Sequence, residues 1–218
     1  MEHFEQLRAT MVDNQIRTRG VTEPALLAQM ARLPRERFVP ADRQSVAYSD
    51  DLHWLGQGVK RRFIMAPAKL AKLLQLAAIT PDEAVLEIGA ATGYGTAVIA
   101  GLASSVVGLE ADADLAARAA ATLKDLGIAN ATIRVGDIAA LGGSKFDVIF
   151  VQGALDSVPE AMLGALKPGG RLIAVLPTDG VAVAHVFVRT GKTITGRAEF
   201  DLSLPLLNQE PPVAEFVF

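Results

Sequence analysis

The sequence predicts an α/β fold, with a doubly wound, mostly parallel sheet of seven strands, C-terminal antiparallel strands and an N-terminal helical extension. From residue 84 onward, short apolar segments alternate with helix-like segments, which is typical of a parallel sheet covered on both faces. After Pro177 two β-prone segments flank Thr190-Gly191-Lys192, and this pattern predicts an antiparallel hairpin. The 218 residues are expected to form one compact unit, with an extension over 1–80 and an α/β part over 81–218.

The extension is expected to be mainly helical. Residues 4–19 and 23–32 have amphipathic patterns, and Thr22 is the expected N-cap of the second helix, with Pro24 in its first turn. The proline-bracketed residues 35–39 are expected to leave the helix as a short extended piece. Two further segments complete the extension: an irregular stretch over 50–62 and a helix over 67–78 with one apolar stripe.

The α/β part divides into clear elements. Helices are expected over 94–102, 112–127 and 158–166. Strands are expected over 84–89, 105–110, 131–135, 146–151, 170–176, 183–188 and 193–200, with 214–218 as a further candidate edge strand.

Composition excludes several classes of protein. Half of the residues are apolar and 21% are charged, which is ordinary for a globular domain. No apolar run approaches the roughly 20 residues that span a bilayer, so we expect no membrane partner. The chain has no cysteine, which excludes disulfides and thiolate metal sites and fits a cytoplasmic protein. Its three histidines are scattered, so no metal site is expected, and no basic stripe with interleaved aromatics suggests nucleic acid.

The first strand of the α/β part leads into a turn of small residues, Gly89 to Gly95. Such a strand–turn–helix unit presents a nucleotide-like ligand with backbone groups and a helix N-terminus. Glu110 ends the next strand, where a carboxylate can accept both hydroxyls of a ribose, and Asp137 follows the third. A dinucleotide site needs a glycine where Ala91 stands, which argues against a dinucleotide.

These positions resemble the motifs of class I methyltransferases, which use S-adenosylmethionine. The resemblance implies that the glycine turn lies along the methionine and ribose, that Glu110 binds the ribose and that Asp137 faces the adenine. Each acid also has a structural interpretation: Glu87 satisfied by backbone donors, Glu110 as a solvated strand end, and Asp137 as a helix N-cap. The cofactor-binding residues implied are Glu87, Gly89, Ala90, Ala91, Thr92, Gly93, Tyr94, Glu110, Gly136, Asp137 and Gln152.

Segments outside the cofactor turn carry further motifs: Pro34-Arg35-Glu36-Arg37-Phe38-Val39-Pro40, Ala47-Tyr48-Ser49-Asp50, Gly56-Gln57-Gly58, Phe146-Asp147-Val148-Ile149 and Leu166 to Leu172. These motifs resemble the protein-L-isoaspartate O-methyltransferase family. The resemblance implies methyl transfer to the free carboxylate of isoaspartyl residues in damaged proteins, with a protein or peptide, or a small acidic molecule, as acceptor. The segment Val151 to Asp156 lacks the Asn/Asp-Pro-Pro-aromatic sequence of enzymes that methylate base amines.

One segment departs from that family. The family has Thr-Ile-Ser-Gln-Pro where this chain has Phe63-Ile64-Met65-Ala66-Pro67, so Met65 takes the place of a serine that lies at the reacting centre. One hypothesis is that the loop has been remodelled for another carboxylate or hydroxyl, with Arg61 or Arg62 contacting an anion. The other is that the protein binds the cofactor without transferring the methyl group. The acceptor-side candidates are Met65, Arg61, Arg62 and His53.

Overall fold

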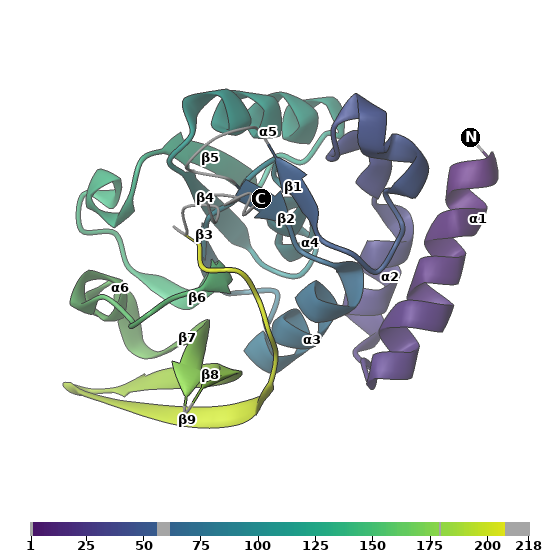
Figure 1. Cartoon of the computed structure of the whole chain (residues 1–218). Helices are drawn as coiled ribbons and strands as arrows, with labels where there is room; N and C mark the ends of the chain where they lie inside the picture. Colours follow the sequence, from purple (N-terminus) through teal and green to yellow (C-terminus); the bar gives the residue numbers. More distant parts are fainter. Residues whose placement is uncertain (1, 56–61, 179, 208–218) are drawn as a thin grey trace, which may run out of the picture.

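A seven-stranded sheet forms the centre of the molecule in the computed structural model, which describes residues 2–55, 62–178 and 180–207 (Figure 1). The strand order is β5-β4-β3-β6-β7-β8-β9, so the predicted fold class is confirmed. The strands of this sheet are β3 Ala84–Ile88, β4 Ser105–Glu110, β5 Ala131–Val135, β6 Phe146–Ala154, β7 Leu166–Thr178, β8 Val181–Thr190 and β9 Thr193–Asp201.

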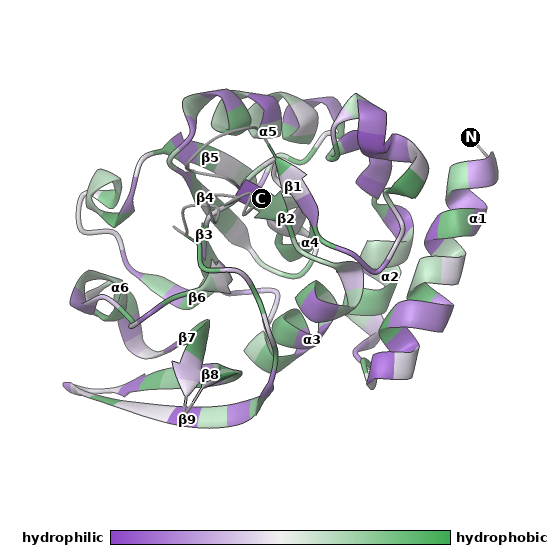
Figure 2. Cartoon of the chain, viewed as in Figure 1, coloured by the Kyte–Doolittle hydropathy of each residue, from purple (hydrophilic) through white to green (hydrophobic). Residues whose placement is uncertain are grey.

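Helices cover both faces of this sheet. Figure 2 shows that outer helices such as α1 and α5 alternate hydrophilic with hydrophobic residues, as expected of helices with one face on a core. No helix in the described ranges is long and apolar enough to cross a bilayer. The helices are α1 Glu2–Met11, α2 Pro24–Arg32, α3 Pro67–Ala77, α4 Tyr94–Ala100, α5 Ala113–Asp125 and α6 Glu160–Gly164.

The order in which strands join the sheet reverses between β3 and β6. From β3 the chain proceeds outward to β4 and β5 through α4 and α5, and it then returns to β6 on the other side of β3. All these strands pair in parallel, whereas β8 and β9 are antiparallel to their neighbours. In open sheets of this kind the ligand crevice lies at the carboxyl ends of the strands where the order reverses. The topology therefore directs attention to the ends of β3, β4 and β6.

Successive residues of each strand enter opposite cores. Val85 and Val148 pack in one hydrophobic cluster, which includes residues of α3 and α4, while Leu86 and Ile149 pack in the other, which includes Met162 of α6. This alternation follows from the two-residue period of a β-strand.

The N-terminal extension shares the first of these cores. Met11, Leu26 and Met30 are buried in the same cluster as Val85. The buried Gln29 of α2 also donates a hydrogen bond to the carbonyl of Ala97 in α4 (2.9 Å). The extension is thus packed into the α/β part.

Several sequence predictions for the extension were wrong. The helix over 4–19 changes to a π-helix at Val12–Ile16 and a 3-10 helix at Arg17–Arg19. Glu23 rather than Thr22 caps α2, with its side chain accepting a hydrogen bond from the amide of Ala25 (3.4 Å). The supposed extended piece forms a 3-10 helix over Arg35–Arg37.

One small sheet was not predicted. Within the stretch expected to be irregular, β1 His53–Leu55 pairs antiparallel with β2 Arg62–Ile64, and the pair lies near the carboxyl ends of the central strands (Figure 1). The candidate strand over 214–218 lies outside the described residues, as do Arg61 and Gly56-Gln57-Gly58.

Candidate functional site

The glycine turn connects β3 to α4 at the reversal point of the sheet. Gly89, Ala91 and Gly93 all have left-handed backbone angles, with φ of 82°, 52° and 88°. That conformation costs a non-glycine residue about 1 kcal/mol, so Ala91 is held there against its own preference. The amides of Gly89 and Ala90 both donate to the carbonyl of Leu109, each at 2.9 Å. These amides therefore connect the turn to β4. The sequence had instead suggested that they face a ligand.

Glu110 lies at the end of β4 and is surrounded by donors. Its carboxylate accepts hydrogen bonds from the amides of Ala91 (2.8 Å) and Asp112 (3.0 Å). It also accepts one from Nε of Arg62 on β2, at 2.8 Å. The residue is only 1% exposed, so the interpretation of Glu110 as a solvated strand end is wrong.

Glu87 lies beneath the turn and is fully buried. The Thr96 hydroxyl donates to one carboxylate oxygen and Nε2 of Gln152 donates to the other (2.6 Å). Its partners are thus side chains of α4 and β6, and not the backbone donors that the structural interpretation had supposed. Burial raises the pKa of Glu87 to about 7, although these two hydrogen bonds act in the opposite direction. A Cβ at Gly95 would lie 1.8 Å from the Gln152 amide nitrogen, so this arrangement requires glycine.

Asp137 follows β5 and Gly136, at the edge of the same end of the sheet. Its side chain accepts a hydrogen bond from the amide of Ala139 (2.9 Å) and caps the 3-10 helix Ile138–Leu141. Asp137 is exposed. The N-cap interpretation therefore holds, and contact of Asp137 with an adenine ring stays a prediction.

The acceptor-side segment and the glycine turn meet at a narrow cavity. Met65 and Thr92 are both buried there and both line the cavity. The Thr92 hydroxyl is buried and has no hydrogen-bond partner among the described residues, which marks it as a donor available inside the cavity. The cavity is lined by Phe63, Ile64, Met65, Leu70, Ala90, Ala91, Thr92, Tyr94, Gly95 and Gln152.

Of the other three acceptor-side candidates, the structure describes Arg62 and His53. Arg62 reaches Glu110 from β2, while Arg61 is outside the described residues. His53 is buried on β1, where burial and the charge of Arg35 lower its pKa. His53 does not line the cavity, and its neighbour Trp54 is 44% exposed.

Sequence reasoning missed the role of Arg35, although it lies in the proline-bracketed motif. The side chain is fully buried, and its guanidinium donates to the carbonyls of Ala47 (2.8 Å) and Met65 (2.9 Å). The guanidinium carbon also lies 4.6 Å from the centre of the Tyr94 ring, a cation–π arrangement. Arg35 therefore connects the extension, the acceptor-side segment and the first residue of α4.

Leu207 was also missed. Its carbonyl accepts a hydrogen bond from Nη1 of Arg62 (2.7 Å). A Cβ at Gly89 would lie 2.4 Å from its Cδ1 atom. The chain after β9 thus returns to the glycine turn. No local sequence pattern predicts this contact.

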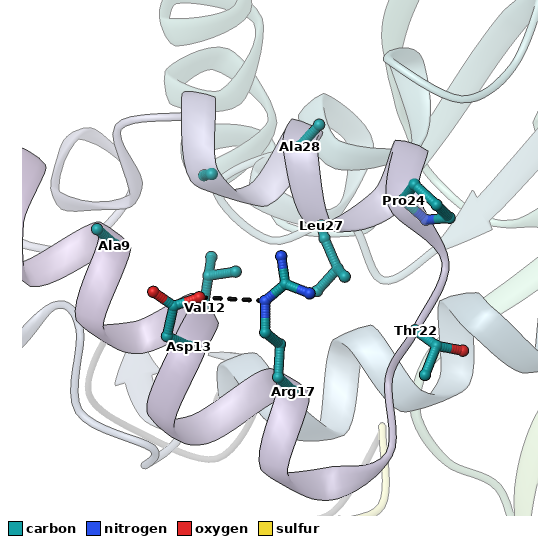
Figure 3. Close-up of a pocket in the computed structure, with 9 residues that line it drawn as sticks. Ala9, Val12, Asp13, Arg17, Thr22, Pro24, Leu27 and Ala28 are labelled. Carbon is teal, nitrogen blue, oxygen red and sulfur yellow. Dashed lines mark hydrogen bonds and ion pairs between the residues drawn. The ribbon is translucent and has the colours of Figure 1, made fainter.

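A separate hollow of about 330 Å³ lies between the first helical segments (Figure 3). Its polar feature is the exposed ion pair of Asp13 with Arg17 (3.1 Å). None of the predicted site residues lines it, and no group of potential metal ligands is found in the described ranges.

The geometry fits the cofactor implied by the sequence. A strand-end carboxylate, a turn in which glycine allows close approach and a buried free hydroxyl meet at one end of the sheet. Comparison with known proteins agrees, because residues 6–203 match the family model for protein-L-isoaspartate(D-aspartate) O-methyltransferase. The chain belongs to this family.

Curated members of the protein-L-isoaspartate O-methyltransferase family resemble almost the whole chain. A protein from Anaeromyxobacter sp. is 36% identical over 202 residues, which are 91% of this chain and 81% of the relative. One from Opitutus terrae is 39% identical over 203 residues, 91% and 84% of the two chains. The predicted methyltransferase activity and methyl donor are confirmed by this homology.

Solved structures of the same family agree with the fold. A protein-L-isoaspartate O-methyltransferase superposes with a TM-score of 0.79 at 25% identity, over 94% of this chain and 67% of the other. A putative family member from Plasmodium falciparum, in complex with S-adenosyl-L-homocysteine, gives 0.75 at 22% identity, over 92% and 97%.

Proposed function

We propose that this chain transfers the methyl group of S-adenosylmethionine to the free carboxylate of isoaspartyl residues in damaged proteins. The observation that carries the proposal is the cavity in which the acceptor-side segment, with Met65, meets the glycine turn. Family membership over residues 6–203 supports the same acceptor. The lack of cysteine supports action in the cytoplasm.

The residues at the reversal point suit the cofactor. Glu110 would hold the ribose hydroxyls, and the turn from Gly89 to Gly93 would lie along the methionine portion. Glu87 and Gln152 would support the turn from below, and Asp137 would face the adenine. The bound cofactor supplies an electrophilic methyl group on its sulfonium.

The protein's own contribution is positioning. A carboxylate acceptor is already ionised at neutral pH, so no general base is needed, and holding the nucleophile about 3 Å from the methyl group can supply much of the rate enhancement. Met65 would keep water away from the reacting atoms. The free hydroxyl of Thr92 would orient the acceptor, a task that the thioether of Met65 cannot perform.

A radiolabel assay tests the acceptor. We expect label from S-adenosylmethionine on a peptide that contains isoaspartate and none on the matched peptide that contains aspartate. Label on proteins of a cell extract but on neither peptide would favour another acid or hydroxyl acceptor. No label anywhere, combined with tight binding of S-adenosylhomocysteine in calorimetry, would favour a binding protein without transfer activity.

Met65→Ser tests the departure from the family. If a hydroxyl at this position is the missing donor, the variant should methylate the isoaspartyl peptide faster than the wild type, by roughly tenfold for one added hydrogen bond to a charged group. Met65→Ala is the matched control, because it shortens the side chain without adding a donor. Equal gains in both variants would show that space, and not hydrogen bonding, limits the wild type.

A further inference from the structure

Arg62 and Glu110 form a buried ion pair at the end of β4. Their side chains are 8% and 0% exposed, and the N–O distance is 2.8 Å. Arg62 lies on β2, three residues before Met65, and its second nitrogen is held by the carbonyl of Leu207. The carboxylate to which the proposed function assigns the ribose therefore already has a partner from the acceptor-side segment.

The lone pairs of Glu110 are nearly all in use. A carboxylate offers about four acceptor positions, and three are taken, by Arg62, by the Asp112 amide and by the Ala91 amide. Two ribose hydroxyls need two positions, so one donor must leave. The amide of Ala91 belongs to the turn and that of Asp112 to the start of α5, whereas Arg62 is a long side chain with rotatable bonds. Arg62 is thus the donor that can be displaced.

A displaced Arg62 needs another anion. A guanidinium that leaves its carboxylate inside a site from which water is largely excluded is costly unless it gains a new partner. Arg62 does not itself line the cavity, but the two residues that follow it on β2, Phe63 and Ile64, do so together with Met65. Arginine binds carboxylates through two parallel hydrogen bonds, and Met65 offers no donor at all.

We propose that Arg62 exchanges partners: the cofactor ribose replaces it on Glu110, and the freed guanidinium binds the carboxylate of the acceptor. This inference rests on the proposed function. It makes Arg62 the residue that selects an anionic acceptor in this chain, where the serine of the family is replaced by Met65. It also sets an order, in which the cofactor binds first and the acceptor second.

Calorimetry with S-adenosylhomocysteine, together with kinetics on the isoaspartyl peptide, tests the exchange in Arg62→Gln. Because no ion pair has to be broken, the variant should bind S-adenosylhomocysteine about tenfold more tightly than the wild type, the value of one charge-assisted hydrogen bond. Because the freed cation is missing, its KM for the peptide should rise by about tenfold or more. In the wild type, the peptide should bind measurably only when S-adenosylhomocysteine is present.

The controls keep the test decisive. Arg197→Gln removes an arginine from the exposed pair with Glu199 (2.6 Å) and should change neither quantity. If Arg62→Gln does not fold, as judged by thermal denaturation, Arg62→Met is measured, because it also removes the cation, and changes in the same directions are expected.

Either of two results overturns the inference while leaving the proposed function intact. One is unchanged or weaker binding of S-adenosylhomocysteine by the Arg62 variant, and the other is an unchanged KM for the peptide. Failure of all the variants and the wild type to bind S-adenosylhomocysteine would instead contradict the proposed function itself.

Discussion

Glu87 and Glu110 are two buried carboxylates of one site with different chemical environments. Glu110 has the guanidinium of Arg62 as a partner. Glu87 has only the neutral donors Thr96 and Gln152. Burial without a cation favours the protonated form of a carboxyl group, and burial is the main cause that raises the pKa of Glu87 to about 7. Glu87 should therefore take up a proton on folding.

This proton makes a pH dependence testable with Glu87→Gln. Between pH 4.5 and about 7 the unfolded chain is ionised at this residue while the folded chain keeps its proton. The contribution of Glu87 to stability is therefore full below pH 4.5 and falls by about 3 kcal/mol as the pH rises to 7. The free energy of unfolding is measured by denaturant titration for both proteins at pH 4.5 and pH 8. The difference between wild type and variant should change by about this amount between the two pH values. Parallel pH profiles of the two proteins would contradict the raised pKa.

The positions of these acids could be predicted from the sequence, but their partners could not. Glu110 ends a strand and is followed by a helix, which is a local pattern. Its partner Arg62 is 48 residues away, and the Met65 contact of Arg35 spans 30 residues. Such pairs are set by tertiary packing. The sequence therefore left Arg61 and Arg62 as alternatives for an anion contact and did not point to Arg35.

At the scale of elements, α4 and α6 show how a glycine in a helix can have opposite effects. Gly95 in α4 faces Glu87 and Gln152, where an added Cβ would lie 2.0 Å and 1.8 Å from their polar atoms. Gly164 at the end of α6 has nothing within 4 Å of that position. Helix propensity alone would favour alanine at both.

Gly95→Ala and Gly164→Ala should therefore change stability in opposite directions. We expect Gly95→Ala to cost about 1–3 kcal/mol, because the methyl group overpacks a buried polar cluster. Gly164→Ala should stabilise the protein by about 0.5–1 kcal/mol, because it restricts the unfolded chain. Chemical denaturation of both variants checks the pair. If Gly95→Ala were more stable than the wild type, the side chains of Glu87 and Gln152 would have moved to accommodate the methyl group.

Most elements of the α/β part were predictable because each carries its own apolar pattern; β4 and β5 even have the expected bounds. The strands β1 and β2 were missed because they are three residues long and pair with each other through tertiary contacts, not through a local apolar pattern. The cap of α2 was misassigned by one residue, since Glu23 and not Thr22 is the N-cap.

For the whole molecule, the shared core predicts a single folding unit. Residues of the extension and of the sheet belong to one hydrophobic cluster, so removal of the extension would expose the face of the sheet that it covers. We therefore expect neither side of the division at residue 80 to be stable on its own.

Two probes can test this cooperativity in one denaturant titration. Trp54 is the only tryptophan in the chain and lies in the extension, edge-on to Phe63 (5.5 Å between ring centres). Its fluorescence reports the extension, while far-ultraviolet circular dichroism reports the whole chain. We expect coincident midpoints, as in a two-state transition. An earlier midpoint for Trp54 would mean that the extension unfolds separately.

The order of the strands has a consequence for solubility. β5 and β9 are the outermost strands of the described sheet, and outer strands can pair with those of another molecule. Exposed arginines lie on both, Arg134 on β5 and Arg197 on β9. Charged side chains on outer strands hinder pairing with another chain, which discourages the sheet from growing into aggregates. The sheet that offers a binding site at the ends of its strands is thus protected along its sides.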